Sequence, residues 1–124
     1  MVSSVISATP AGYDAEIIEV EGDTSKGLPT LQIVGMGNKA IDESKERVRS
    51  AIKNSLLEFP TKKITINLAP AEIPKDGTHF DLPIAISILI LSGQLHQNDI
   101  KNSAFVGELS LNGDIRPVRG ILNI

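Results

Sequence analysis

The sequence contains no cysteine and no tryptophan, and only 3% of its residues are aromatic. Without cysteine, the chain can form neither a disulfide framework nor a thiolate metal site, and it has no thiol nucleophile. The longest apolar run, residues 82–91, is too short to span a bilayer, and residues 1–10 lack the basic start and the uninterrupted apolar stretch of a signal peptide. These absences predict a cytoplasmic protein with no role at a membrane.

Aliphatic residues are abundant enough for one core, since 41% of the 124 residues are hydrophobic. This length and composition predict a single domain, residues 1–124, of the soluble α/β kind. The formal net charge of -3 provides no general attraction to a phosphate backbone, so any contact with nucleic acid has to come from a local basic patch. The chain stops at Ile124 without a capping motif or a polar tail, and we expect a domain excised from something longer.

Hydrophobic patterning in the first third of the chain predicts strands separated by loops that contain proline or glycine. The expected strands are residues 2–6, 13–20 and 28–34. We interpret them as an antiparallel meander. In the second strand, Ala15, Ile17 and Ile18 are candidates for the inward face, and Glu16 and Glu19 for the outward face. One face of the sheet should therefore be exposed to water.

A helical period begins at Asn38. Apolar and small residues recur on one stripe that includes Ile41 and Val48, and charged residues fill the rest, which predicts an amphipathic helix. Asn38 can cap the first amides, and Glu43 with Arg47 has the four-residue spacing of a favourable ion pair.

The second half of the chain adds a strand, a helix and a hairpin. Residues 63–68 alternate in polarity as a strand does. Asp81 can cap a second helix whose body, residues 84–91, is apolar all round and must be buried. Asn112 and Gly113 separate two further apolar stretches, and because both tolerate positive φ they predict a closing β-hairpin with a two-residue type I′ turn.

Few patterns indicate chemistry by themselves. Residues 35–40 match the glycine-rich dinucleotide pattern, but a tight strand-to-helix turn explains the two glycines without a ligand. His79 and Asp81, with Glu72 and Asp76 nearby, are candidates for a metal site, yet their spacing fits no recognised ligand motif, and we expect no metal. The Gly-Lys-Ser or Gly-Lys-Thr sequence of an ATPase phosphate-binding loop is absent, so this chain should not hydrolyse ATP by itself.

Basic residues gather in and after the amphipathic helix. They are Lys45, Arg47, Arg49, Lys53, Lys62 and Lys63. Because acidic residues are interleaved with them in the helix, the favoured interpretation is a solvated, salt-bridged surface. Arg116 and Arg119 lie beside a proline and a glycine just past the hairpin, in a turn suited to contacting a neighbouring domain or subunit. We therefore treat Arg47, Arg49, Arg116 and Arg119 as candidate contacts with a partner or with DNA.

Several sequence blocks, taken in order, resemble a known family. The blocks are residues 27–29 (GLP), 33–35 (IVG), 43–49 (ESKERVR), 64–70 (ITINLAP), 80–85 (FDLPIA) and 105–111 (FVGELSL). Over nearly the whole chain they resemble the amino-terminal domain of the magnesium-chelatase-like ComM/YifB family of AAA+ ATPases. This resemblance implies a ribosomal-protein-S5-domain-2-like α/β (α+β) fold, with two main helices packed on a mixed sheet and a closing β-hairpin.

The resemblance also implies a role. It places the domain ahead of an AAA+ ATPase module, in bacterial proteins associated with DNA branch migration during natural transformation. We therefore expect a non-catalytic accessory domain that supports ring assembly and DNA handling. The implied partners are the AAA+ module of the same chain, further copies in a hexameric ring, and DNA. ATP and magnesium are implied for the ATPase module and not for residues 1–124.

A more distant resemblance concerns the Lon peptidase. Residues 74–81 resemble the Lon segment that carries its nucleophilic serine, and residues 106–114 and 117–120 resemble the stretch leading to its catalytic lysine. In this resemblance His79 takes the place of the serine and Leu122 the place of the lysine. A Ser-Lys dyad needs a hydroxyl and an amine, so the degenerate site Asp76, His79 and Leu122 is expected to be inactive as a peptidase.

Two alternatives stay open at the level of the sequence. The first is a Lon-like peptidase with an unconventional nucleophile such as Thr78 or Ser87. The second is a nucleic-acid-binding module that uses the four arginines named above.

Overall fold

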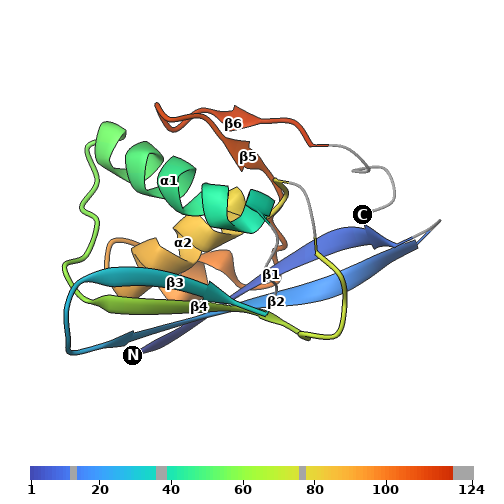
Figure 1. Cartoon of the computed structure of the whole chain (residues 1–124), viewed down its shortest axis with the longest axis horizontal. Helices are drawn as coiled ribbons and strands as arrows, with labels where there is room; N and C mark the ends of the chain where they lie inside the picture. The colour runs from blue at the N-terminus through green and yellow to red at the C-terminus, as the bar shows by residue number, and fades with distance from the viewer. Residues whose placement is uncertain (12–13, 36–38, 76–77, 119–124) are drawn as a thin grey trace.

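The computed structural model describes residues 1–11, 14–35, 39–75 and 78–118. Its elements are β1 (Val2–Ala11), β2 (Asp14–Ser25), β3 (Thr30–Val34), α1 (Lys39–Asn54), β4 (Lys63–Ala69), α2 (Asp81–Leu91), the 3₁₀ helix η1 (Gln97–Ile100), β5 (Glu108–Leu109) and β6 (Ile115–Arg116). Figure 1 shows both α-helices on the same side of the main sheet, with the β5–β6 hairpin beside α1. The mixed α+β architecture implied by the resemblance is confirmed.

The main sheet has the strand order β1-β2-β4-β3, so the predicted meander is confirmed for β1 and β2 but wrong for β3. β1 and β2 form an antiparallel hairpin, β2 pairs antiparallel with β4, and β3 pairs parallel with β4. The physical reason lies in the connection: β3, α1 and β4 form a strand-helix-strand unit, and parallel strands joined by a helix can pair side by side. β4 therefore lies between β2 and β3.

The inward face of β2 was only partly predicted. Ile18 and Val20 are fully buried, whereas the side chain of Ile17 is 69% exposed. Since side chains alternate along a strand, burial of Ile18 places Ile17 on the opposite face, where its register partner is Ala8. Gly22 continues the inward series and lies so close to α2 that an added Cβ would collide with the Ser87 hydroxyl.

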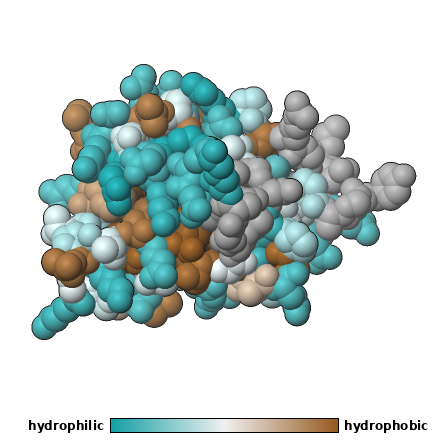
Figure 2. Space-filling model, viewed as in Figure 1, coloured by the Kyte–Doolittle hydropathy of each residue, from teal (hydrophilic) through white to brown (hydrophobic). Residues whose placement is uncertain are grey.

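The core lies between the sheet and the helices. α2 is buried on nearly all sides, as predicted, and Ile84 and Ile88 are fully buried. α1 contributes Val48, Ala51 and Ile52 from one stripe. On the face seen in Figure 2, hydrophilic residues cover the upper part, where α1 lies, and hydrophobic residues show below them toward the sheet. α1 is therefore the amphipathic helix that the sequence predicts.

The closing hairpin is confirmed, but the predicted turn type is wrong. Five residues, 110–114, separate the last paired residues, Leu109 and Ile115. The amide of Ser110 donates to Asp114 O (2.9 Å), and the amide of Gly113 donates to Ser110 O (3.0 Å). Of Asn112 and Gly113, only the glycine has a positive φ, 94°, whereas a type I′ turn needs positive φ at both. The longer loop removes the need for a left-handed asparagine.

The outer edge of β1 is partly covered by other segments. The side chain of Gln97 bonds both backbone groups of Ser4, accepting from its amide at 3.0 Å and donating to its carbonyl at 2.7 Å. The Phe105 amide donates to Ile6 O at 2.9 Å. These bonds occupy groups that another strand could otherwise pair with. In the described ranges, no helix is both long and apolar enough to cross a membrane.

Candidate functional site

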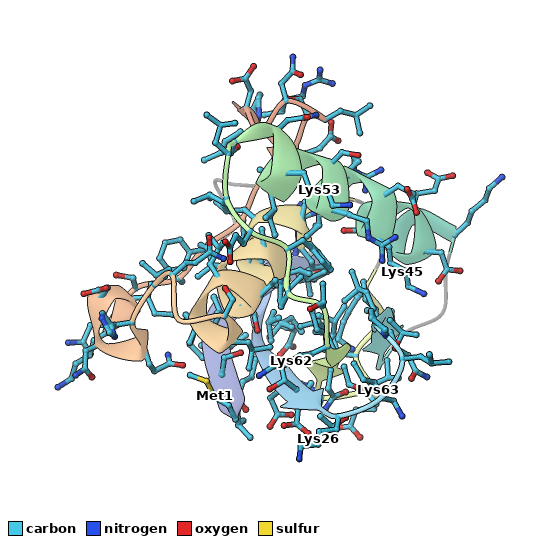
Figure 3. The ribbon with its side chains drawn as sticks, turned by 90° about the vertical axis from the view of Figure 1, so that its left-hand side faces the viewer. Met1, Lys26, Lys45, Lys53, Lys62 and Lys63 are labelled. Atoms are coloured by element: carbon cyan, nitrogen blue, oxygen red, sulfur yellow. The ribbon has the colours of Figure 1, made fainter. Side chains whose placement is uncertain are left out.

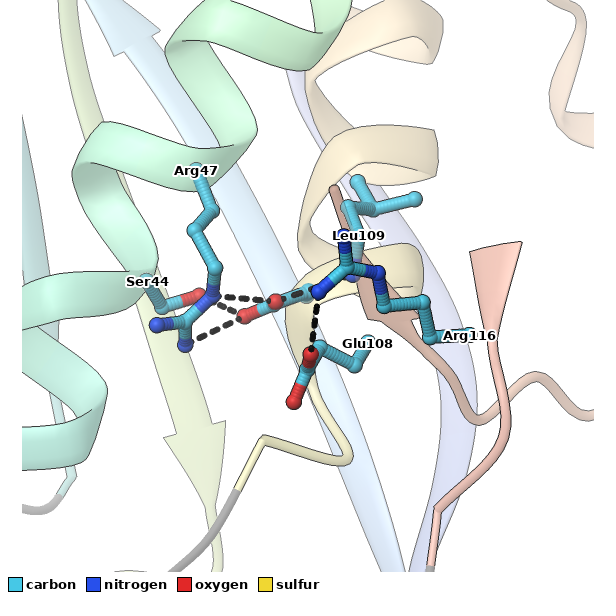
Figure 4. Close-up of polar contacts among 6 residues, drawn as sticks. Ser44, Arg47, Glu108, Leu109 and Arg116 are labelled. Atoms are coloured by element: carbon cyan, nitrogen blue, oxygen red, sulfur yellow. Dashed lines mark hydrogen bonds and ion pairs between the residues drawn. The ribbon is translucent and has the colours of Figure 1, made fainter. Parts of the chain in front are cut away.

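A buried carboxylate, Asp81, joins three elements of the fold. Its side chain is 1% exposed. Arg47 of α1 donates to it twice, from Nε at 2.7 Å and from Nη2 at 3.1 Å, and Ser44 donates its hydroxyl proton. The amide of Leu109 in β5 donates to it at 3.1 Å. Figure 4 shows these contacts converging between α1, the start of α2 and the hairpin.

Asp81 does not cap α2, which contradicts the sequence-based prediction. The N-cap residue is Phe80, and it makes no side-chain capping bond. Arg47 likewise forms its ion pair with Asp81, where Glu43 was expected. The hydrogen bond that Arg47 donates to Asp81 raises the pKa of Arg47 above its usual value, against the opposing effect of burial. A buried carboxylate depends on charged hydrogen-bond donors to stabilise its charge, because burial removes the water that would solvate it.

The candidate arginines do not share one surface. The Arg47 side chain is 20% exposed and is bound to Asp81, whereas Arg49, two residues further along the helix, faces a different direction. Arg116 lies 3.8 Å from Glu108 within the hairpin. Arg119 is outside the described residues. Their contact with a partner or with DNA stays a prediction.

The Lon-like segment is held in place by its backbone. The Gly107 amide donates to His79 O and the Leu82 amide donates to Gly107 O, both at 3.0 Å. These bonds fix His79 and the first turn of α2 against Gly107, the residue before β5. Asp76 and Leu122 lie outside the described residues, so their arrangement around His79 stays a prediction.

Lys75, in the same segment, was not singled out by the sequence-based analysis. It is fully buried, and its Nζ donates to the carbonyl oxygens of Pro70 (2.6 Å), Ile73 (2.8 Å) and Gly35 (3.2 Å). Burial lowers the pKa of the Lys75 amine. Because an ammonium has three protons, these three carbonyls can take all of them. Lys75 therefore ties the loop after β4 to the end of β3, a structural role.

Ser87, a candidate nucleophile in the peptidase alternative, lies inside the core. It is fully buried, and its hydroxyl is 2.6 Å from that of Ser3. A polypeptide substrate cannot reach it in this fold. Thr78 is half-buried, and its carbonyl oxygen accepts a hydrogen bond from the Asp81 amide at 3.4 Å. The structure thus gives Ser87 a packing role and leaves Thr78 as the more accessible of the two hydroxyls.

The glycine-rich segment is only partly described, since residues 36–38 lie outside the described ranges. Gly35 has a φ of 99°, and an added Cβ would collide with the carbonyl of Leu68. Close packing of β3 on β4 therefore explains this glycine without a ligand. Around His79 and Asp81, and elsewhere in the described part of the chain, no group of three or more metal-ligating side chains is assembled.

Comparison with known proteins places this fold among relatives. Residues 20–124 match the family model described as subunit ChlI of Mg-chelatase. The chain is 44% identical to competence protein ComM of Haemophilus influenzae, over 95% of this chain and 23% of the relative. It is 48% identical to the uncharacterized protein YifB of Escherichia coli, over 98% of this chain and 24% of the relative. It is also 30% identical to the Lon protease of Methylocella silvestris, over 97% of this chain and 15% of the relative.

Proposed function

The chain belongs to the family of subunit ChlI of Mg-chelatase, and we propose that it is a non-catalytic accessory domain of an AAA+ ATPase of the ComM/YifB type. The observation that carries this proposal is how much of the chain is similar in sequence to ComM and YifB. Identity of 44–48% runs along almost all of this chain, yet the chain spans only about a quarter of the ComM and YifB relatives. The remaining three quarters leave room for a motor module, which this chain would help to assemble and to apply to DNA.

The residues of this chain do not fit ATP and magnesium. The sequence has no Gly-Lys-Ser or Gly-Lys-Thr, and the buried lysine that the structure describes, Lys75, is bound to backbone carbonyls. Any nucleotide chemistry is therefore assigned to the rest of the parent protein. In this proposal the chain contributes a rigid body whose polar core residues, Asp81 and Lys75, hold the fold together.

ATP hydrolysis tests the proposal. The 124-residue chain should release no phosphate from ATP above the buffer control, whereas the parent protein should hydrolyse ATP and lose that activity when its Walker lysine is changed to alanine. A parent protein that lacks residues 1–124 should keep basal hydrolysis but assemble less completely by size-exclusion chromatography with light scattering. Hydrolysis by the 124-residue chain, or a parent sequence without a Walker motif, would contradict the assignment.

A Lon-like peptidase is the second candidate function, favoured by the 30% identity to Lon protease. We expect no casein digestion by the wild-type chain, and none by the Thr78→Ala or Ser87→Ala variant, because Ser87 is inaccessible and Lys75 is committed to carbonyls. The Ser87→Ala variant should instead be less stable by about 1–2 kcal/mol, since Ser3 loses a buried hydrogen-bond partner. Wild-type digestion that disappears with Thr78→Ala would establish the peptidase.

A further inference from the structure

One end of the molecule carries half of its basic residues. We call it the lysine end and define it as Lys26, Lys45, Arg49, Lys53, Lys62 and Lys63. Figure 3 faces this end, where the loop after β2 and the loop before β4 meet below α1. The sequence has 12 lysines and arginines in all, against 15 acidic residues, so this gathering is local and opposes the net charge of the chain.

Two elements bring these side chains to the same end. Lys45, Arg49 and Lys53 are spaced by four residues and lie along one stripe of α1. Lys63 opens β4, paired in register with the last residue of β2 and the first of β3. Its side chain lies next to Gly27, in the loop that carries Lys26. Figure 3 shows the strand-end lysines below those of the helix.

The charge of the lysine end is largely uncompensated. Within the described ranges, no ion pair reaches any of its five lysines, and the one ion pair there joins Arg49 to Glu46 at 3.7 Å. Asp23 pairs with the amino group of Met1 at 3.9 Å, and Glu58 is exposed. Among the described residues of the lysine end, the expected pairing of helix charges is therefore seen between Arg49 and Glu46. Unpaired charges of one sign attract a polyanion.

Among the hollows in the described part of the chain, two contain more than one of these charges, and they share Thr61. One, of about 460 Å³, includes Lys26 and Lys62 in its lining. The other, of about 430 Å³, is lined by Arg49, Lys53 and Phe59 together with two prolines. The Arg49 guanidinium lies 5.3 Å from the centre of the Phe59 ring. A guanidinium next to an aromatic ring offers surfaces on which an unstacked base can lie.

We propose that the lysine end binds the phosphate backbone of a single-stranded nucleic acid, with a base received beside Arg49 and Phe59. The lysines supply the charge for the phosphates, and the second hollow offers a place for a base that a duplex would keep stacked. This inference adds a binding surface to the proposed handling of DNA, and it rests on that proposal for the assignment of the bound strand as DNA. It also moves the expected contact away from Arg47 and Arg116, which are paired with acids.

A salt titration of binding tests the proposal. Fluorescence anisotropy of a labelled thymidine oligonucleotide is measured with the wild-type chain and with two double variants, Lys53→Gln/Lys62→Gln and the control Lys39→Gln/Lys101→Gln. Both variants remove the same charge, and Lys39 and Lys101 are exposed outside the lysine end. Each phosphate contact to a single strand contributes about -0.7 to the slope of log K against log salt, so losing two should make the slope shallower by about 1.4. The control should keep the wild-type slope.

Three results would overturn the inference. The first is no detectable binding by the wild type at low salt, and the second is an equal loss in the control, which would assign binding to net charge. The third is equal or tighter binding of a duplex of the same sequence. Circular dichroism melting of all three proteins excludes unfolding as a cause. The assay contains no ATP, so a failed ATPase assignment for the parent protein would leave its result unchanged, and a failed binding result would leave that assignment standing.

Discussion

Changing Asp81 to asparagine should lower the free energy of unfolding by about 3–5 kcal/mol, the loss typical of removing one partner from a buried ion pair. The variant leaves Arg47, whose side chain is 20% exposed, without its paired carboxylate. It also weakens the acceptor for Ser44 and for the Leu109 amide. Because these bonds join α1, α2 and β5, the hairpin should loosen together with the first turn of α2. Urea unfolding followed by circular dichroism measures the change.

A double-mutant cycle separates the ion pair from general damage at this position. Arg47→Met/Asp81→Asn should recover part of the loss, because the uncompensated charge is gone. Asp114→Asn is the matched control, since Asp114 is exposed in the hairpin turn, and its effect should stay within about 0.5 kcal/mol. An Asp81→Asn variant as stable as the control would show that the carboxylate contributes little to the fold.

Local sequence patterns were sufficient to predict the helices and strands, but not the order of the strands in the sheet. The stripe of α1 and the continuous apolar run of α2 predict their own burial, because each pattern depends on residues close in sequence. The position of β4 between β2 and β3 depends on pairing across some 40 residues, and no short pattern records it. The same holds for the face of β2, where Ile17 and Ile18 are equally apolar and the core packed against the sheet selects Ile18.

The roles of the polar residues in the candidate site depend on contacts between distant parts of the sequence, which local sequence rules do not capture. An aspartate at the start of an apolar helix has the pattern of an N-cap, and the sequence gives no sign of Arg47, 34 residues away, as its partner. A lysine between a proline and an aspartate has the pattern of a surface turn, yet Lys75 is fully buried. In both cases long-range contacts decide the role. The resemblance to Lon covers this segment, but it does not predict a lysine bound to carbonyls.

Replacing Lys75 with methionine should destabilise the chain by about 3 kcal/mol. Methionine fills a similar volume but donates no proton, so the carbonyls of Gly35, Pro70 and Ile73 lose a buried donor. Each unsatisfied buried group costs about 1–3 kcal/mol, and relief from burying a charge offsets part of that sum. Thermal and urea unfolding measure the loss. Lys101→Met, at an exposed position, should change stability by less than about 0.5 kcal/mol.

The pH dependence of unfolding provides an independent measure of how the charge of Lys75 affects the stability of the fold. Burial lowers the pKa of its amine below the ordinary 10.5, so in the alkaline range up to that value the unfolded chain binds more protons than the folded one. The stability of the wild type relative to Lys75→Met should therefore rise with pH between the folded-state pKa and 10.5, and stay level below the folded-state pKa, where the amine is protonated in both states. A difference that shrinks as the pH rises would mean that the three carbonyls stabilise the ammonium by more than burial destabilises it. Lys75 would then be a charged clamp whose strength depends on remaining protonated.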